Sequence, residues 1–110
     1  MNKFVIALLL GVSWVQASAQ DRYVLIGAGS GTCGQWAEIR RNPIPAVQNA
    51  YTSWLQGYLS GINRVPQAYL PDAASMNLYV DKYCRENPLE RTFSAIDQLE
   101  NELVQRKAGR

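Results

Sequence analysis

Apolar side chains recur every three or four residues along most of the chain beyond residue 31, which is the period of an amphipathic α-helix. The broadest stripe predicts a helix over residues 45–62, with inward positions at Val47, Tyr51, Trp54, Leu55, Tyr58 and Ile62. A shorter helix is expected over residues 33–41, with Thr32 as its N-cap and with Cys33, Trp36 and Ile39 facing inward. The two helices are separated by Asn42-Pro43-Ile44-Pro45, because proline cannot continue a helix.

The second half of the chain predicts two more helices. A loop over residues 64–71 leads to a third helix that Asp72 or Ser75 can cap and that ends at Cys84, with Met76, Tyr79 or Val80, and Tyr83 inward. The sequence Asn87-Pro88-Leu89-Glu90 has the form of a helix start, with an N-cap, a first-turn proline and a glutamate that can reach back to the cap. We expect a fourth helix over residues 88–106 that buries Leu89, Phe93, Ile96, Leu99 and Leu103 and places Asp97, Glu100, Glu102 and Arg106 on the opposite face.

The first residues have the form of an export signal. Lys3 supplies a positive start, residues 4–15 an apolar run, and Ala17-Ser18-Ala19 a small-x-small cleavage site. The run is shorter than the roughly 20 residues that cross a bilayer, so a retained interfacial anchor is the alternative. We expect a signal peptide over residues 1–19, a short extended, glycine-rich N-terminal arm over residues 20–31 and an all-α domain over residues 32–110. The cleaved chain is expected to be soluble, without stable membrane insertion.

The chain has two cysteines, Cys33 and Cys84. In an exported domain of this size a disulfide between them is the ordinary expectation, since small cores often need a cross-link. The alternative is a redox pair or a metal site. The spacing is not Cys-x-x-Cys and the chain contains no histidine, so both alternatives are disfavoured and no metal is expected.

Four residues are candidates for contact with a partner. Gly57 and Gly61 lie four apart on one face of the second helix, where each glycine costs up to about 1 kcal/mol. Close approach of another helix is the expected reason, and a ligand groove is the alternative. Tyr69 and Leu70 lie in a loop bounded by prolines, where exposed apolar side chains would indicate a contact with another protein.

Several classes of activity find little support in the sequence. Gly29-Ser30-Gly31-Thr32-Cys33-Gly34 fits the G-x-G-x-x-G pattern of dinucleotide sites, but no parallel strands or ribose-binding acid follow it. Without histidine there is no Ser–His or Cys–His pair. A carboxylate pair could still hydrolyse a glycoside, and the candidates are Asp72, Asp81, Glu86 and Glu90, all at predicted caps or exposed faces. We therefore expect neither an enzyme nor a cofactor.

Charge argues against two kinds of partner. Removing a signal that contains Lys3 leaves ten basic side chains (11 less one) against nine acidic ones. This near balance gives no electrostatic basis for binding nucleic acid or an anionic membrane. Other proteins remain as the expected partners.

Two segments that contain the cysteines resemble a known family. Gly31-Thr32-Cys33-Gly34-Gln35-Trp36 and Tyr83-Cys84-Arg85-Glu86-Asn87-Pro88 are similar to the two cysteine boxes of the HdeA/HdeB family of small helical periplasmic acid-stress chaperones. The resemblance spans residues 32–103. It implies a four-to-five-helix domain with one disulfide between Cys33 and Cys84, a periplasmic location and the capacity to form a homodimer.

The middle of the chain resembles a second family. Trp54-Leu55-Gln56-Gly57-Tyr58-Leu59-Ser60-Gly61 is similar to the Gly-Tyr-x-x-Gly helix of the Tai/Rap immunity proteins, which neutralise effectors of type VI secretion, although the additional cysteines expected of those proteins are missing. The sequence thus predicts an exported, non-catalytic protein-binding domain. Its clients are unfolded proteins if it is a stress chaperone, or one specific effector if it is an immunity protein.

Overall fold

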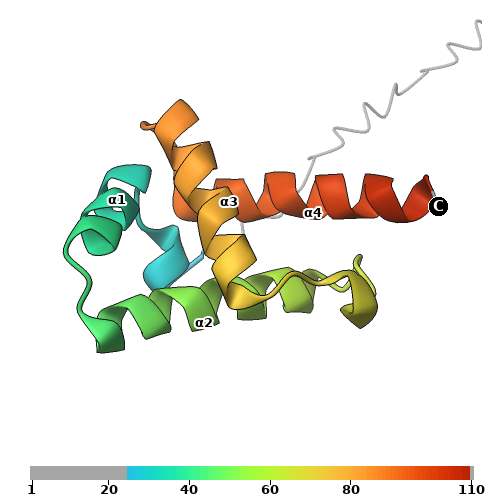
Figure 1. Cartoon of the computed structure of the whole chain (residues 1–110), viewed down its shortest axis with the longest axis horizontal. Coiled ribbons are helices and arrows are strands. Elements are labelled where there is room, and N and C mark those ends of the chain that lie inside the picture. The colour runs from blue at the N-terminus through green and yellow to red at the C-terminus, as the bar shows by residue number, and fades with distance from the viewer. Residues whose placement is uncertain (1–24, 110) are drawn as a thin grey trace, which may run out of the picture.

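The computed structural model describes residues 25–109, which form an all-α domain and confirm the predicted fold class. The helices are α1 (Cys33–Arg41), α2 (Pro45–Ile62), α3 (Ala73–Glu86) and α4 (Thr92–Ala108), with two 3-10 turns, η1 (Ala28–Ser30) and η2 (Gln67–Tyr69). In Figure 1, α2 and α4 run along the length of the molecule, α3 runs across from one to the other, and α1 lies at one end. The predicted signal peptide lies outside the described residues.

The helices α1, α2 and α3 begin where the sequence predicts. The Thr32 hydroxyl accepts from the Gln35 backbone N–H at 3.1 Å, and the Gln35 side chain accepts from the Thr32 N–H at 2.9 Å, which completes a capping box. Pro45 is the first residue of α2, where its missing N–H costs nothing. The Asp72 carboxylate accepts from the Ser75 N–H at 2.7 Å, so Asp72 and not Ser75 caps α3.

The predicted start of α4 at Pro88 is wrong, because the helix begins at Thr92. Asn87 does not cap α4 but ends α3, and its side chain donates to the Tyr83 carbonyl at 3.1 Å. The chain then turns, and the Glu90 carbonyl accepts from the Cys33 N–H at 2.8 Å. This long-range bond takes the segment away from the helical path. Leu89, predicted to be buried, is therefore 97% exposed on the turn.

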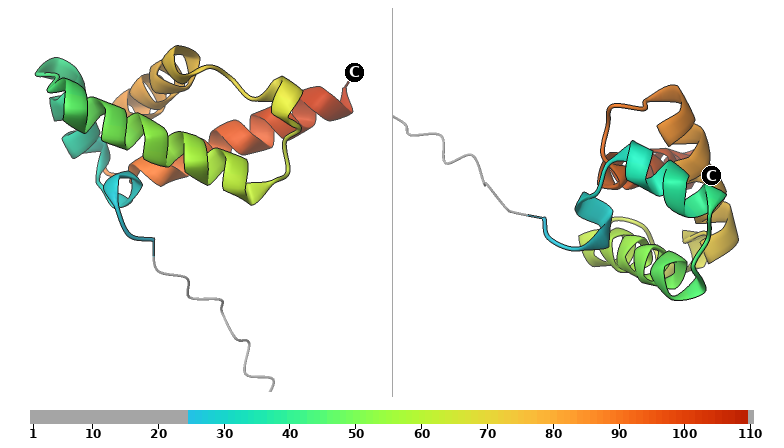
Figure 2. Two further views of the ribbon diagram at one scale, coloured as in Figure 1. Left: turned by 90° about the horizontal axis from the view of Figure 1, so that it is seen from below. Right: turned by 90° about the vertical axis from the view of Figure 1, so that its left-hand side faces the viewer.

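The core lies where the four helices meet and contains most of the predicted inward residues. Its buried members are Cys33, Trp36, Leu55, Leu59, Met76, Val80, Cys84, Ala95, Ile96 and Leu99. Besides Leu89, two predictions about exposure fail. Val47 is 38% exposed near the start of α2, and Glu100 is only 5% exposed although the α4 pattern placed it on the outer face. The view from below in Figure 2 shows α2 lying over α4, and Glu100 of α4 forms an ion pair with Arg64, just beyond α2.

The glycine-rich segment before α1 makes a sharp turn that packs on α2. Gly27 has φ 102°, a conformation that glycine adopts readily, and the Trp54 indole N–H donates to the Ile26 carbonyl at 2.9 Å. Gly29 lies against the Trp54 ring so closely that a Cβ there would overlap it. Gly29, the first glycine of the pattern that resembles a dinucleotide fingerprint, thus has a packing role in this fold.

Candidate functional site

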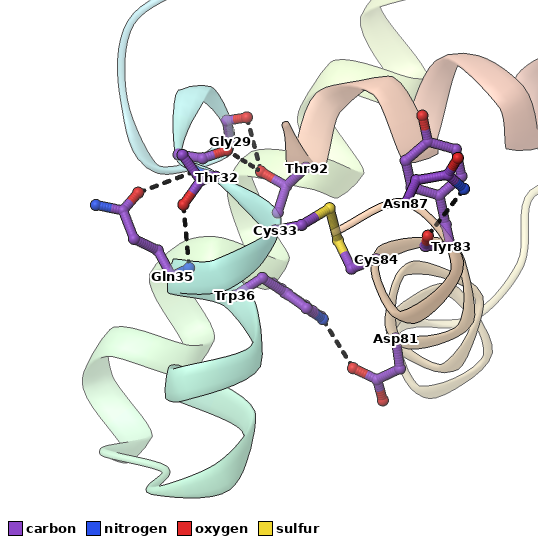
Figure 3. Close-up of a disulfide and its surroundings, with 11 residues drawn as sticks. Gly29, Thr32, Cys33, Gln35, Trp36, Asp81, Tyr83, Cys84, Asn87 and Thr92 are labelled. Carbon is purple, nitrogen blue, oxygen red and sulfur yellow. Dashed lines mark hydrogen bonds between the residues drawn. A yellow bond between two sulfur atoms is a disulfide. The ribbon is translucent and has the colours of Figure 1, made fainter. Parts of the chain in front are cut away.

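Cys33 and Cys84 form the predicted disulfide, which joins the first turn of α1 to the last turn of α3 across 51 residues of sequence. Figure 3 shows the Trp36 indole beside it, directed at Asp81. The indole N–H donates to Asp81 at 2.7 Å, and the Arg40 guanidinium binds both oxygens of the same carboxylate at 2.9–3.2 Å. The hydrogen bond to Asp81 raises the pKa of Arg40. A covalent bond and one carboxylate together hold α1 on α3.

Three further carboxylates, all on α4, join that helix to different neighbours. Asp97 accepts from the Tyr58 hydroxyl of α2 at 2.7 Å, and Glu102 accepts from the Tyr79 hydroxyl of α3 at 2.9 Å. Glu100 forms an ion pair at 2.8 Å with Arg64, just beyond α2. We call these three the α4 carboxylate contacts. All of them lie in the middle of the helix, beyond its first turn.

The first turn of α4 is attached by groups of another kind. The Thr92 hydroxyl donates to the Gly29 carbonyl at 2.8 Å, and the Thr92 N–H donates to the Gly31 carbonyl at 3.0 Å. The Arg91 side chain donates to the Ser30 carbonyl at 2.7 Å, and Figure 3 shows Thr92 reaching toward the turn at Gly29. We call these the α4 backbone contacts, because the acceptor in each is a peptide carbonyl. Acid that protonates carboxylates leaves such acceptors unchanged.

Burial and charge act on the tyrosines beside α4. Desolvation raises the pKa of Tyr79 well above its usual value, and the hydrogen bond to Glu102 adds to the shift. Desolvation also raises the pKa of Tyr83. Both phenols therefore stay neutral and can donate hydrogen bonds over the whole physiological range. With Lys82, Glu86, Gln98, Glu102 and Arg106 they line a cavity of about 230 Å³.

The structure contradicts the helix contact predicted at Gly57 and Gly61. Both are exposed, and a Cβ built on either would meet nothing within 4 Å. No neighbouring helix within residues 25–109 therefore accounts for these glycines.

The predicted loop residues lie at the edge of the core. Tyr69 ends the η2 turn and is half-buried, and Leu70 is half-buried and packs against the core cluster. Neither is among the strongly exposed apolar residues. Leu89 is, and it extends from a turn fixed by the hydrogen bonds of Asn87 and Glu90. Sequence reasoning missed it because it assigned Leu89 to the buried face of α4.

The carboxylates considered for catalysis are spread over the fold. Asp72 caps α3, and hydrogen bonds from Ser75 lower its pKa. Asp81 is bound to Trp36 and Arg40, while Glu86 and Glu90 are exposed. Over residues 25–109, no three histidine, cysteine, aspartate or glutamate side chains gather in a way that could hold a metal ion. Asp97, Glu100 and Glu102, which the sequence pattern had placed on the outer face of α4, instead each contact a side chain outside that helix.

Comparison with models of known families, with characterised proteins and with solved structures finds no match for this chain. The helices of the described region are each too short or too polar to cross a bilayer. The candidate functional feature of this fold is the set of contacts that Asp81, Asp97, Glu100 and Glu102 make between its elements.

Proposed function

We propose that the chain is an exported, non-catalytic protein-binding domain that acts as a periplasmic acid-stress chaperone of the HdeA/HdeB type. The observation that carries the proposal is that four carboxylates, Asp81, Asp97, Glu100 and Glu102, each join separate elements of the fold. Strong acid protonates carboxylates, so the same change weakens every one of these contacts. An acid-stress chaperone needs this response, because it must uncover apolar surface when its clients unfold.

The disulfide would keep the chaperone from unfolding completely when its apolar surface is uncovered. A bond that acid does not break keeps α1 on α3 while the ionic contacts weaken, so the loosened molecule stays tethered. A disulfide also fits the oxidising compartment to which the predicted signal peptide would direct the chain. Apolar residues of the core then become available to clients without complete unfolding.

The test is to mix the purified, signal-free chain with an unrelated enzyme and shift both to about pH 2–3. We expect light scattering by the client to fall as the chain approaches an equimolar ratio. A reduced and alkylated sample of the same chain is the control for the tether. Client aggregation that is unchanged at a several-fold excess of the oxidised chain would rule out the chaperone role.

A second candidate function is supported by Leu89. An exposed leucine on a turn fixed by hydrogen bonds and placed next to a disulfide is suited to enter a pocket of one partner protein at neutral pH, as an immunity protein of the Tai/Rap type would require. Capture of a single tight partner at pH 7, lost in Leu89→Asp, would favour this alternative over the chaperone.

A further inference from the structure

The two ends of α4 are attached by chemistry that responds differently to acid. The α4 backbone contacts hold Thr92 and Arg91 through peptide carbonyls of the η1 turn and of Gly31, which follows it. The α4 carboxylate contacts hold the middle of the helix through Asp97, Glu100 and Glu102. Acid therefore weakens the attachment of α4 from its middle onward and leaves its first turn in place.

The covalent topology singles out the same helix. The disulfide closes a ring from Cys33 to Cys84, which contains all of α1 and α2 and most of α3. Helix α4 follows the ring, so it can move away from the others without strain on a closed loop. Helix α2 is tethered at both of its ends within that ring.

Charge drives the separation further once the carboxylates are neutral. Helix α4 carries Asp97, Glu100 and Glu102 against Arg106 and Lys107, a net charge of −1 (−3 + 2) that becomes +2 when the three acids are protonated. The charged and titratable groups that face it are Tyr79, Lys82, Tyr83 and Glu86 from α3, Tyr58 from α2 and Arg64 beyond it; η1 offers only neutral groups. In acid, Lys82 and Arg64 stay positive and face a helix that has become positive.

We propose that α4 is the helix that acid releases, pivoting at Thr92, and that clients bind the apolar surface this uncovers. On α4 that surface comprises Ile96, Leu99 and Leu103, and on α2 it includes Leu55 and Leu59. Its ligand is an apolar segment of an unfolded polypeptide. The inference rests on the proposed chaperone function and adds to it the moving element and the binding face.

Hydrogen exchange with mass spectrometry tests the inference on the intact oxidised chain. Protection of residues 97–108 and of the disulfide-linked segments 33–41 and 73–86 is followed from pH 7 to about pH 2, with labelling times corrected for intrinsic exchange. We expect residues 97–108 to lose protection at higher pH than the linked segments. Client aggregation is measured on the same samples.

Amide variants give the matched comparison, since an amide resembles a protonated carboxyl group. We expect the triple variant Asp97→Asn, Glu100→Gln, Glu102→Gln to lose protection of α4 and to suppress aggregation at a higher pH than the parent, because its three contacts are already weakened at neutral pH. The control removes charge from exposed side chains that lie outside the α4 carboxylate contacts, Glu38→Gln and Glu90→Gln, and should shift neither midpoint. If the triple variant does not fold, Glu102→Gln against Glu38→Gln provides the same comparison with a smaller shift.

The outcomes separate the inference from the function. Suppression of aggregation while residues 97–108 stay protected, or an equal shift in the control variants, overturns the release of α4 and leaves the chaperone role standing. Release of α4 without any suppression overturns the chaperone role and, with it, the client-binding face. If release of α4 and suppression of client aggregation shift together, and only in the α4 variants, the result supports both the chaperone role and the release of α4.

Discussion

Helices α1 and α4 both pack on α3, but they are attached to it by different means. The attachment of α1 includes the Cys33–Cys84 bond, and its one carboxylate contact, at Asp81, lies beside that bond. The attachment of α4 to its neighbours includes no covalent bond, and its polar contacts beyond the first turn end on carboxylates. The interface of α1 with α3 is therefore fixed covalently, and we expect the attachment of α4 to depend on pH.

This difference indicates how a small helical domain can open in part without unfolding completely. A protein of this length has a marginal core, so the loss of several polar contacts is enough to change its structure. The cross-link between α1 and α3 keeps that interface closed, so the change in structure is limited to the attachment of α4. The predictions below test the two attachments, beginning with the largest effect.

Removing the disulfide should have the largest effect on stability. In Cys33→Ala, Cys84→Ala the closed loop of 51 residues is lost, and the chain-entropy relation gives a cost of about 4 kcal/mol in the free energy of unfolding. Urea denaturation at pH 7 measures this free energy, and the parent chain with its disulfide reduced should show a similar decrease. A decrease below about 1 kcal/mol would mean that the cross-link contributes little to this fold.

A methyl group at Gly29 should disturb the turn that supports the first turn of α4. In Gly29→Ala the added Cβ overlaps the Trp54 ring, so the ring or the turn must move, at a cost of about 3 kcal/mol. The control is Gly57→Ala, where the Cβ enters open space in a helix and should add up to about 1 kcal/mol of stability. Thermal unfolding of the two variants should therefore shift in opposite directions, and equal shifts would contradict the packing described for η1.

Loss of the Arg64 side chain should weaken the contact between the α2 end and α4. In Arg64→Ala the Glu100 carboxylate stays buried without its ion pair, and we expect a cost of about 2 kcal/mol, between the values for exposed and fully buried pairs. Arg41→Ala breaks an exposed pair with Glu38 inside α1 and should cost less than about 0.5 kcal/mol. Urea denaturation at pH 7 compares the two, and equal losses would show that Glu100 is not a critical contact.

The interface between α3 and α4 should also respond to alkaline pH. Because desolvation raises the pKa of Tyr79 in the folded state, its contribution to stability is complete below the ordinary tyrosine value of 10 and is lost as pH rises above that value. The variant Tyr79→Phe lacks this titration. The stability difference between parent and variant should therefore shrink between about pH 9 and 12, and a constant difference would contradict the burial of the phenol.

The helices that could be predicted from sequence are those whose ends depend on local chemistry. Thr32 with Gln35, Pro45 and Asp72 act within one helical turn of their own position, and α1, α2 and α3 begin as expected. The start of α4 was mispredicted because Asn87 bonds back to Tyr83 and Glu90 bonds to Cys33, far away in sequence. The local sequence pattern does not show whether a residue such as Asn87 ends the helix before it or caps the helix after it.

The candidate site was harder to predict for the same reason. The partners Tyr58 and Asp97 are 39 residues apart, and Tyr79 and Glu102 are 23 apart, so their contacts depend on how the helices cross. Glu100 lies on the polar side of the α4 pattern, yet it is buried in the fold and pairs with Arg64, 36 residues earlier in the chain (100 less 64). The disulfide, by contrast, could be predicted from two cysteines in a small chain with a predicted export signal.

Binding of an apolar fluorescent dye as a function of pH tests the central claim most directly, since that claim is that protonated carboxylates uncover apolar surface while the disulfide stays intact. The account predicts that dye fluorescence is low at pH 7, rises as the pH falls below about 4 and returns to its starting value on neutralisation. Dye binding that stays at its neutral level down to about pH 2 would contradict it.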